Sequence, residues 1–400
     1  MSGHGIPCSG AETKTAGADE RSRILIVDDL QSSRTLIGSV LSAAGFLRLD
    51  YAADGIEAID RLYADPPDMV ILDIVMPRMD GFEVCRKVRE ELRLDIPILI
   101  QTGVQEAEYR VMAFDAGASD IVSKPVNAGE LVSRVRLHLE RRRLMDSLQR
   151  YRRRMEEELL AARAMQQSLL MADDDVGAIV IPRGATMQTY HKTSNVLGGD
   201  LWQVFPVDEH RFGIFMIDLS GHGVSAAINA FRVHMLAGGM MTLRADPAGW
   251  LEALNLSLFQ ILPVEHFATA FYGVVEPRQG RLDYAAAGSP PPILLRDGGG
   301  WEALDGGGLI LGCSQSARYP VRRAEIGSGD RLFVYSDALY ENFDDPDRTF
   351  DTAELAERVE LAVTDRALPF SDALLNALFG TSDCQLRDDL TWMLVEVNAP

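Results

Sequence analysis

The chain has 400 residues, 47% of them hydrophobic and 24% charged, a composition typical of a protein with packed cores. This length predicts two or three domains. The formal net charge of −20 argues against non-specific binding to nucleic acid and against binding to an anionic membrane surface.

The cysteines and the first residues indicate the compartment. Cys8, Cys85, Cys313 and Cys384 are far apart and form no CxxC pair, so we expect neither a disulfide framework nor a zinc site. A reducing, cytoplasmic location is the simple interpretation. Residues 1–20 are polar and small, without the apolar core of a signal peptide, and predict a disordered tail. No uninterrupted apolar run is long enough to span a bilayer, so any membrane role would depend on a partner.

The segment 21–136 alternates short apolar runs with amphipathic stretches of helical length. The apolar runs lie at 23–27, 68–73, 96–102 and 120–125. The amphipathic stretches lie at about 32–44, 55–64, 81–92 and 105–116, and another begins near 127. Strands that alternate with helices predict an α/β domain, with a parallel sheet covered by helices on both faces.

Polar residues stand where these apolar runs end. Because the carboxyl ends of parallel strands meet at one edge of a sheet, we expect Asp28, Asp29, Asp73, Thr102 and Lys124 to lie together. Three carboxylates repel one another and favour a divalent cation such as Mg²⁺, and a lysine beside a hydroxyl suits a phosphoryl group. For each acid alone, a helix N-cap or a turn is the simpler role, but their order along the strands favours a site.

This segment resembles the response-regulator receiver domain over residues 23–140. The matching motifs are VDD (27–29), LDIVMPRMDG (72–81), QTG (101–103) and SKP (123–125). The resemblance implies a flavodoxin-like fold with a five-stranded parallel sheet. It also implies that a sensor histidine kinase phosphorylates Asp73.

The same resemblance implies the surroundings of the phosphoacceptor. Mg²⁺ would be held by Asp28, Asp29, Asp73 and the carbonyl of Val75, while Thr102 and Lys124 would contact the phosphoryl group. The family often has an aromatic switch residue three positions before the lysine. Here that position is Ile121, so the linker helix becomes an alternative carrier of the signal.

A long helix is predicted next, because residues 137–170 contain neither glycine nor proline. Its apolar positions recur every three or four residues, at Leu144, Leu148, Tyr151, Met155, Leu159, Ala162, Met165 and Leu169. This heptad-like stripe, with one irregular step, favours a coiled-coil homodimer over a solvated single helix. We therefore expect a helical linker at 137–174.

The segment 175–400 consists of short apolar runs separated by turn signals, with helical patches at about 224–243, 246–261 and 352–378. Strands with segregated helices predict an α+β domain, a β-sandwich flanked by helices.

The stretch IDLSGHG, residues 217–223, allows two kinds of chemistry. A nucleophilic serine needs a strained turn and a base in reach, but Ser220 and His222 are two positions apart in a glycine-rich loop without a G-x-S-x-G elbow. A metal site instead predicts further acids beside strands, and these are Asp200, Asp218, Asp337 and the pair Asp388-Asp389. Acids without cysteine favour Mg²⁺ or Mn²⁺, and two such ions can share a hydroxide that attacks a phosphate.

These acids lie in motifs that resemble the PPM-type metal-dependent serine/threonine phosphatases, in the bacterial branch typified by the stage II sporulation E phosphatase. The resemblance covers roughly 165–398, through ARAMQQSLLM (162–171), GGD, DLSGHG, AAAGSPPP (285–292), LILG (309–312), YSDALYE and DDLT. It implies two Mn²⁺ or Mg²⁺ ions, bridged by Asp218.

The resemblance also implies the roles of the other residues. The Leu219 carbonyl would add a ligand, Asp337 and Asp388 would complete one metal, and Asp200 would bind the other directly or through water, with Asp389 as the alternative to Asp388. His222 would protonate the leaving group or only shape its loop. The family commonly has an acid at Gln203, a glycine at Ala338 and a histidine at Ser289. Ala338 could strain the turn after Asp337.

Together these features predict a disordered tail (1–20), a receiver domain (21–136), a helical linker (137–174) and a phosphatase domain (175–400). The hypothesis is a response regulator in which phosphorylation of Asp73 controls a protein serine/threonine phosphatase. The resemblance implies, as substrate, a serine-phosphorylated anti-sigma-factor antagonist of the STAS type. The alternative is a catalytically inactive, phosphatase-like adaptor that binds a sigma factor or another partner. A DNA-binding regulator has no support, because the chain has no basic C-terminal helix-turn-helix.

Overall fold

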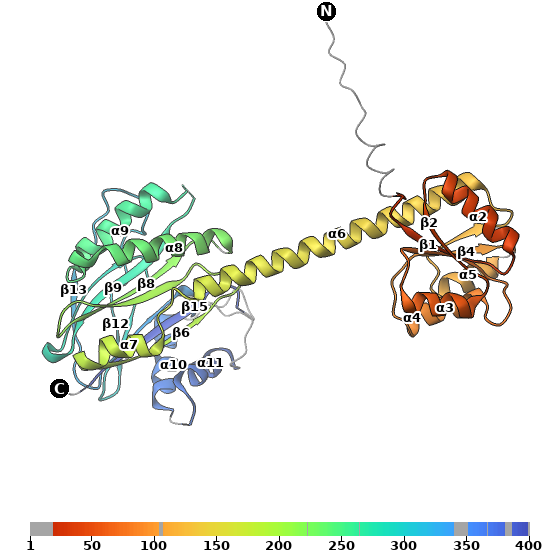
Figure 1. Ribbon diagram of the computed structural model, residues 1–400. Coiled ribbons are helices and arrows are strands. Elements are labelled where there is room, and N and C mark those ends of the chain that lie inside the picture. Colours follow the sequence, from red (N-terminus) through yellow and green to blue (C-terminus); the bar gives the residue numbers. More distant parts are fainter. Residues whose placement is uncertain are drawn as a thin grey trace, which may run out of the picture. The chain divides into compact units, whose positions relative to one another are not determined.

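The computed structural model describes residues 19–103, 107–221, 223–263, 265–339, 351–365, 367–380 and 386–398. It divides into two compact units, Met1–Arg154 and Met155–Pro400 (Figure 1). The predicted tail lies outside the described residues up to residue 18, and so does His222. Among the helices of the described part, none is both long and apolar enough to cross a bilayer.

The first unit contains a parallel five-stranded sheet with the strand order β2-β1-β3-β4-β5. Its strands are β1 (Arg23–Val27), β2 (Arg48–Ala52), β3 (Met69–Asp73), β4 (Ile98–Thr102) and β5 (Asp120–Ser123). The central strands β3 and β4 are buried along their whole length, as expected for a sheet covered on both faces.

Helices cover both faces of this sheet (Figure 1). They are α2 (Gln31–Ala43), α3 (Gly55–Ala64), α4 (Gly81–Glu90), α5 (Ala107–Asp115) and the first turns of α6 (Ala128–Gln167). One core cluster joins the sheet to α2 and α6, and the other joins it to α3, α4 and α5. The predicted α/β fold class is confirmed.

Helix α6 spans two predicted segments, because the helix expected from about 127 and the one expected over 137–170 are continuous. Its first turns bury Leu131, Val135 and Leu139 against the sheet. Farther along, the side chains of Leu148 and Tyr151 are 60% and 63% exposed.

The second unit contains two antiparallel sheets, with the strand orders β13-β10-β9-β8-β7 and β12-β11-β14-β15-β6. The strands of the first sheet are β7 (Leu201–Pro206), β8 (Phe212–Leu219), β9 (Ala268–Glu276), β10 (Arg281–Ala287) and β13 (Arg322–Glu325). Those of the second sheet are β6 (Ala185–Lys192), β11 (Ile293–Leu295), β12 (Trp301–Ala303), β14 (Arg331–Tyr335) and β15 (Leu390–Val397). The helices are α7 (Asp173–Val180), α8 (Val224–Gly239), α9 (Pro247–Ile261), α10 (Thr352–Thr364) and α11 (Phe370–Phe379).

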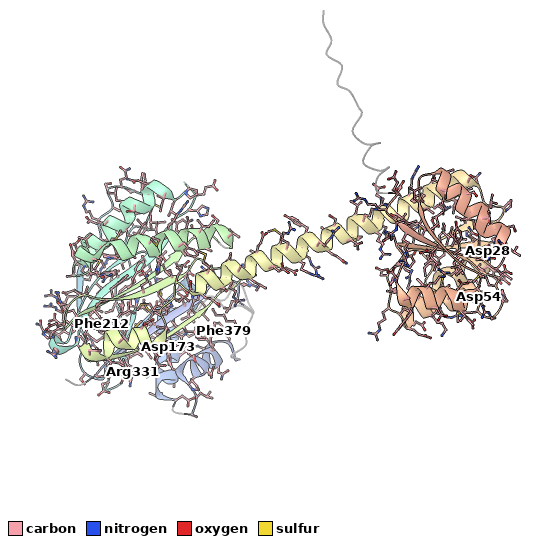
Figure 2. The ribbon with its side chains drawn as sticks, viewed as in Figure 1. Asp28, Asp54, Asp173, Phe212, Arg331 and Phe379 are labelled. Atoms are coloured by element: carbon pink, nitrogen blue, oxygen red, sulfur yellow. The ribbon has the colours of Figure 1, made fainter. Side chains whose placement is uncertain are left out.

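Alternation along the strands builds a sandwich with helices outside both sheets. On β8, Phe212 (labelled in Figure 2) and Ile214 pack between the two sheets, whereas Phe215 and Ile217 pack against α8 and α9. On the other sheet, Phe333 packs against α10 and α11. This arrangement confirms the predicted sandwich flanked by helices.

Candidate phosphoacceptor and metal sites

Three acidic side chains of the first unit meet at the carboxyl edge of the parallel sheet. Asp28 follows β1, Asp73 ends β3, and Asp29 stands next to Asp28; each offers an oxygen within 4.8 Å of the others. Asp28 is fully buried and Asp73 is 7% exposed, while Asp29 faces solvent. A cluster of carboxylate oxygens with one exposed member matches the preference of Mg²⁺ for oxygen ligands and retained water.

Lys124 connects these acids from the loop after β5. Its Nζ lies 2.9 Å from Asp28 Oδ2 and 2.8 Å from Asp73 Oδ2. Burial alone would lower the pKa of Lys124, but the hydrogen bonds to Asp73 and Asp28 outweigh that effect and raise it. Burial raises the pKa of Asp73 in spite of Lys124, so this carboxylate gains from any further cation at the edge.

Local backbone geometry holds the phosphoacceptor in place. The Ile74 N–H donates to Asp73 Oδ1 at 2.9 Å, and a Cβ at Gly81 would stand 2.4 Å from the Asp73 carbonyl oxygen, so only glycine permits this approach. Thr102 is buried at the end of β4, and Val75 lies in the loop after Asp73 with its side chain exposed. The structure thus gathers at one edge the phosphoryl-contacting residues that the sequence predicts, Thr102 and Lys124, with Asp73.

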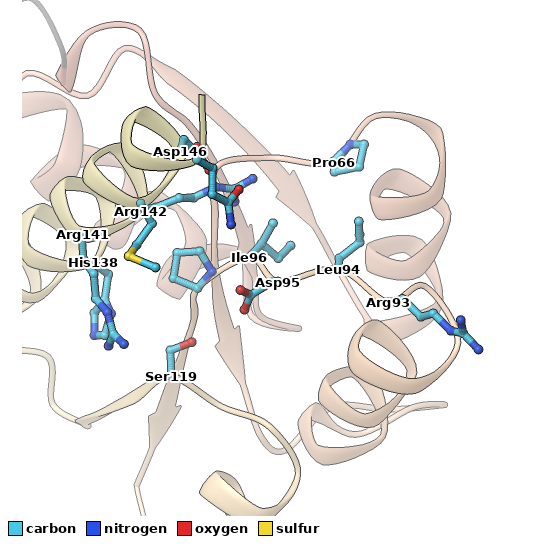
Figure 3. A pocket seen from close by; sticks show the side chains of 13 residues that line it. Pro66, Arg93, Leu94, Asp95, Ile96, Ser119, His138, Arg141, Arg142 and Asp146 are labelled. Atoms are coloured by element: carbon cyan, nitrogen blue, oxygen red, sulfur yellow. The ribbon is translucent and has the colours of Figure 1, made fainter. Parts of the chain in front are cut away.

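An open cavity of about 650 Å³ lies elsewhere in the first unit (Figure 3). It is lined by residues that precede β4 and β5, such as Asp95 and Ser119, and by α6 residues such as His138 and Arg142. Asp95 and Ser119 lie at the amino ends of β4 and β5, at the edge of the sheet opposite the one that carries Asp73. The cavity is therefore separate from the phosphoacceptor site.

The acids of the second unit meet at one end of the sandwich. Asp200 precedes β7, and Asp218 is the penultimate residue of its neighbour β8. In the other sheet, Asp337 follows β14, and Asp388 precedes its neighbour β15. Across the two sheets, the charges of Asp337 and Asp388 act on Asp218. The fold therefore brings together the four acids that the sequence singled out.

Asp200 shows why this end of the sandwich suits a cation. It is 2% exposed, and among the described residues neither of its carboxylate oxygens has a hydrogen-bond partner. Burial and repulsion by Asp218 raise its pKa well above the usual value, and the nearby Thr391 opposes this only in part. Burial and repulsion by Asp337 and Asp388 likewise raise the pKa of Asp218 to about 8. Buried charges are normally paired or bound to metal, so this donor set is compatible with divalent ions.

The two acidic sites differ in the distances between their carboxylate oxygens. In the described part of the chain, Asp28, Asp29 and Asp73 form a group of three whose ligand atoms lie within 4.8 Å of one another, and no three acids of the second unit meet that distance. The carbonyl of Leu219 belongs to this second site by position, because a Cβ on Gly199 would stand 2.6 Å from it.

The adjacent acids Asp388 and Asp389 have different surroundings. Asp389 Oδ1 accepts from the Ser194 N–H at 2.8 Å and from its hydroxyl at 3.1 Å, and Oδ2 accepts from the Gly199 N–H at 2.6 Å. Asp389 is buried, whereas Asp388 is exposed. Asp389 thus holds the segment between β6 and β7, a role that sequence reasoning missed because these partners are far apart along the chain.

The SGHG loop is held by a neighbouring segment. Ser220 accepts from the Phe267 N–H through Oγ at 2.8 Å, and its own N–H donates to the Phe267 carbonyl at 2.9 Å. Ser220 therefore helps to fix the conformation of this loop. His266 lies next to Gly221, and its buried Nδ1 has no hydrogen-bond partner among the described residues. It is a second imidazole near the loop that carries His222, and no sequence motif pointed to it.

The three residues that depart from the family pattern have different surroundings in the structure. Gln203 is buried in β7 and contacts His234 of α8, with 2.7 Å between Nε2 and Nδ1. Ala338 is fully buried directly after Asp337, and Ser289 has a buried Oγ without a partner among the described residues.

Comparisons with known proteins match the two units separately. Residues 24–136 match the family model described as response regulator receiver domain, and residues 208–398 match that of stage II sporulation protein E (SpoIIE). The chain is 42% identical over 124 residues to the response regulator MprA of Mycobacterium ulcerans, covering 31% of this chain and 53% of MprA. It is 41% identical over 127 residues to MprA of Mycobacterium tuberculosis, covering 32% of this chain and 54% of that protein. The chain thus spans about half the length of the curated relatives it matches.

A solved structure shows the fold of the second unit. The SiaA-PP2C domain of Pseudomonas aeruginosa has a TM-score of 0.52 and 19% sequence identity, covering 62% of this chain and 99% of that domain. This likeness supports a PP2C-like sandwich.

Proposed function

We propose that this chain, which joins a response regulator receiver domain to a SpoIIE-type domain, is a metal-dependent protein serine/threonine phosphatase controlled by phosphorylation of Asp73. The observation that carries the proposal is Asp200, a buried carboxylate with no hydrogen-bond partner among the described residues, at the end of the sandwich that also holds Asp218. A buried acid in this state either takes up a proton or binds a cation, and the acids beside it favour a cation because it relieves their mutual repulsion.

The proposed catalytic residues divide into metal ligands and a proton donor. Asp200, Asp218, Asp337, Asp388 and the Leu219 carbonyl would hold two Mn²⁺ or Mg²⁺ ions. When bound, such ions supply a hydroxide nucleophile and neutralise phosphate charge. His222 would protonate the leaving serine oxygen or shape the loop.

In the receiver, Asp28, Asp29, Asp73 and the Val75 carbonyl would hold Mg²⁺, and Asp73 would accept a phosphoryl group from a sensor histidine kinase. Lys124 already contacts Asp73 and would shift to the phosphoryl oxygens, with Thr102 as a second contact. The added charge would redistribute the contacts at this edge and alter α6, which ends in the second unit.

The biological setting is proposed from the family. The substrate would be a phosphoserine STAS-type anti-sigma-factor antagonist in a partner-switching pathway, in the cytoplasm. The boundaries proposed for the parts are 21–136, 137–174 and 175–400. The exposed apolar side chains of α6, including Leu148 and Tyr151, support a homodimer paired through this helix.

The departures from the family pattern at Gln203, Ala338 and Ser289 leave a second candidate function. In this alternative the domain binds no catalytic metal and acts as an adaptor, controlled by the receiver, for a sigma factor or another partner.

Hydrolysis of an aryl phosphate by the full chain, with and without Mn²⁺, tests the proposal. We expect turnover that requires Mn²⁺ and falls at least about a hundredfold in Asp218→Asn, because a bridging ligand is lost. The matched control is Glu209→Gln, which removes one exposed acid of the same unit and should retain the wild-type rate. Turnover that persists in Asp218→Asn would contradict the mechanism, and no turnover in any phosphorylation state would favour the adaptor.

A further inference from the structure

Gln166 is buried at the end of a helix whose neighbouring side chains are exposed. It is 6% exposed, whereas Met165 beside it is 59% exposed. Gln167 on its other side faces solvent as well. Burying a primary amide is unfavourable unless its donor and acceptor are both satisfied, so the position of Gln166 needs an explanation.

The side-chain amide of Gln166 pairs with the backbone of Gly198. Its Nε2 donates to the Gly198 carbonyl at 2.6 Å, and its Oε1 accepts from the Gly198 N–H at 3.2 Å. One side chain thus satisfies both backbone polar groups of a residue 32 positions away. The pairing is specific to an amide, because it needs a donor and an acceptor on one planar group.

Gly198 belongs to the turn that carries Asp200. The next residue, Gly199, donates its N–H to Asp389 Oδ2 at 2.6 Å. A Cβ on Gly199 would stand 2.6 Å from the carbonyl oxygen of Leu219, so the turn lies directly against the segment that contains Asp218. A displacement of Gly198 would therefore move Asp200 relative to the other acids.

We propose that Gln166 is a positioning residue that sets the place of Asp200 and joins the end of α6 to the metal site. This inference rests on the proposed metal-dependent phosphatase. Helix α6 begins at Ala128 in the first unit and ends at Gln167, one residue beyond the amide pair. A rotation or shift of the helix end breaks or strains two hydrogen bonds to Gly198, and this changes the arrangement of the acids. Through this contact, a change in α6 reaches the active site.

Gln166→Leu tests the inference, with Gln167→Leu as the matched control. Both variants replace a glutamine by leucine at adjacent positions of the same helix, but only the first removes the pairing with Gly198. In Gln166→Leu we expect faster amide hydrogen exchange in the peptide covering residues 197–201. We also expect the Mn²⁺ concentration for half-maximal aryl phosphatase activity to rise about tenfold. Gln167→Leu should match the wild-type chain in both measurements.

A second variant separates positioning from folding. Gln166→Glu keeps the size and the acceptor but loses the donor to the Gly198 carbonyl, and it should shift both measurements in the same direction as Gln166→Leu. Thermal unfolding of each variant shows whether the second unit remains folded, and a loss of folded protein would lower the rate without shifting the Mn²⁺ dependence.

The failures of the two proposals are distinguishable. If the wild-type chain shows no Mn²⁺-dependent turnover, the proposed function fails, and the exchange measurement still reports whether Gln166 holds the turn. If the wild-type chain is active and Gln166→Leu equals Gln167→Leu in both exchange and Mn²⁺ dependence, the inference about Gln166 is wrong.

Discussion

At the scale of single residues, the surroundings of a carboxylate indicate its role better than its motif does. Asp388 and Asp389 are adjacent in DDLT, and the sequence leaves open which one binds metal. Asp389 is buried and accepts hydrogen bonds from Ser194 and Gly199 through both oxygens, whereas Asp388 is exposed. We therefore propose that Asp388 is the metal ligand and that Asp389 holds the loop between β6 and β7.

This assignment predicts different defects for two matched variants. Asp388→Asn should raise the Mn²⁺ concentration needed for half-maximal activity, with the thermal midpoint unchanged. Asp389→Asn places an amide donor against the N–H donors of the loop and should reduce the free energy of unfolding by about 1–3 kcal/mol. Calorimetry beside metal titrations measures both quantities, and the reverse pattern would exchange the two roles.

At the scale of elements, a cluster of charged residues joins the first turns of α6 to the parallel sheet of the first unit. The Arg134 Nη1 lies 2.7 Å from each carboxylate oxygen of Asp120 at the start of β5, and His138 Nε2 lies 3.1 Å from Oδ2. Burial alone would raise the pKa of Asp120, but the hydrogen bonds from Arg134, the Ile121 backbone and His138 outweigh it and lower that pKa. The ionised carboxylate therefore stabilises the docking of α6.

We expect Asp120→Asn to lower the free energy of local opening of the first turns of α6 by about 1–3 kcal/mol at pH 7. Because the pKa of Asp120 is lower in the folded state, its stabilisation is complete above the unfolded value of about 3.9 and is lost as the pH falls through the folded value. Amide exchange of residues 131–139, compared between wild type and variant at each pH, measures the difference. Asp60→Asn, an exposed acid on α3, is the control. A difference that persists at a pH well below the folded pKa would contradict the role of the charge.

The elements also show which features a sequence reveals. Buried strands such as β3 were predicted because parallel strands covered on both faces are apolar throughout. Strand β2 (RLDYA) was missed because it lies at the sheet edge beside β1, where most of its residues are partly exposed and several are polar. The single helical patch expected at 352–378 is two helices, since Pro369 lacks an N–H and disfavours helix at the residue before it. Helix α7 was not among the predicted helical patches, although its three acids favour the first turn of a helix.

The same contrast applies to the candidate sites. The acids at strand ends could be predicted, because strand topology alone brings them to one edge. The contacts of Asp389 and Gln166 could not, because each is made with residues that are distant in the sequence and meet only in the folded chain.

At the scale of the whole molecule, α6 is the element through which the receiver-like unit would act on the proposed phosphatase. Its middle carries Leu144, Leu148 and Tyr151 at 64%, 60% and 63% exposure, spaced by four and three residues. An apolar stripe with this spacing is stabilised when a second helix covers it. A second copy of the chain is the proposed partner.

Light scattering of the purified chain should therefore give the mass of a dimer. Leu148→Arg should shift the chain to the monomer, because it places a charge in the paired stripe. Gln149→Arg adds the same charge one position away and should remain dimeric. A wild-type chain that is monomeric in both phosphorylation states would rule out pairing through α6.

The central claim is that phosphorylation of the receiver controls the phosphatase. The most direct test measures Mn²⁺-dependent aryl phosphate hydrolysis before and after treatment with acetyl phosphate, in the wild-type chain and in Asp73→Asn, with phosphate incorporation followed by mass. We predict that the wild-type rate changes about fivefold or more when Asp73 is phosphorylated, and that Asp73→Asn neither takes up phosphate nor changes its rate. Equal rates in the phosphorylated and unphosphorylated wild-type chain would contradict the account.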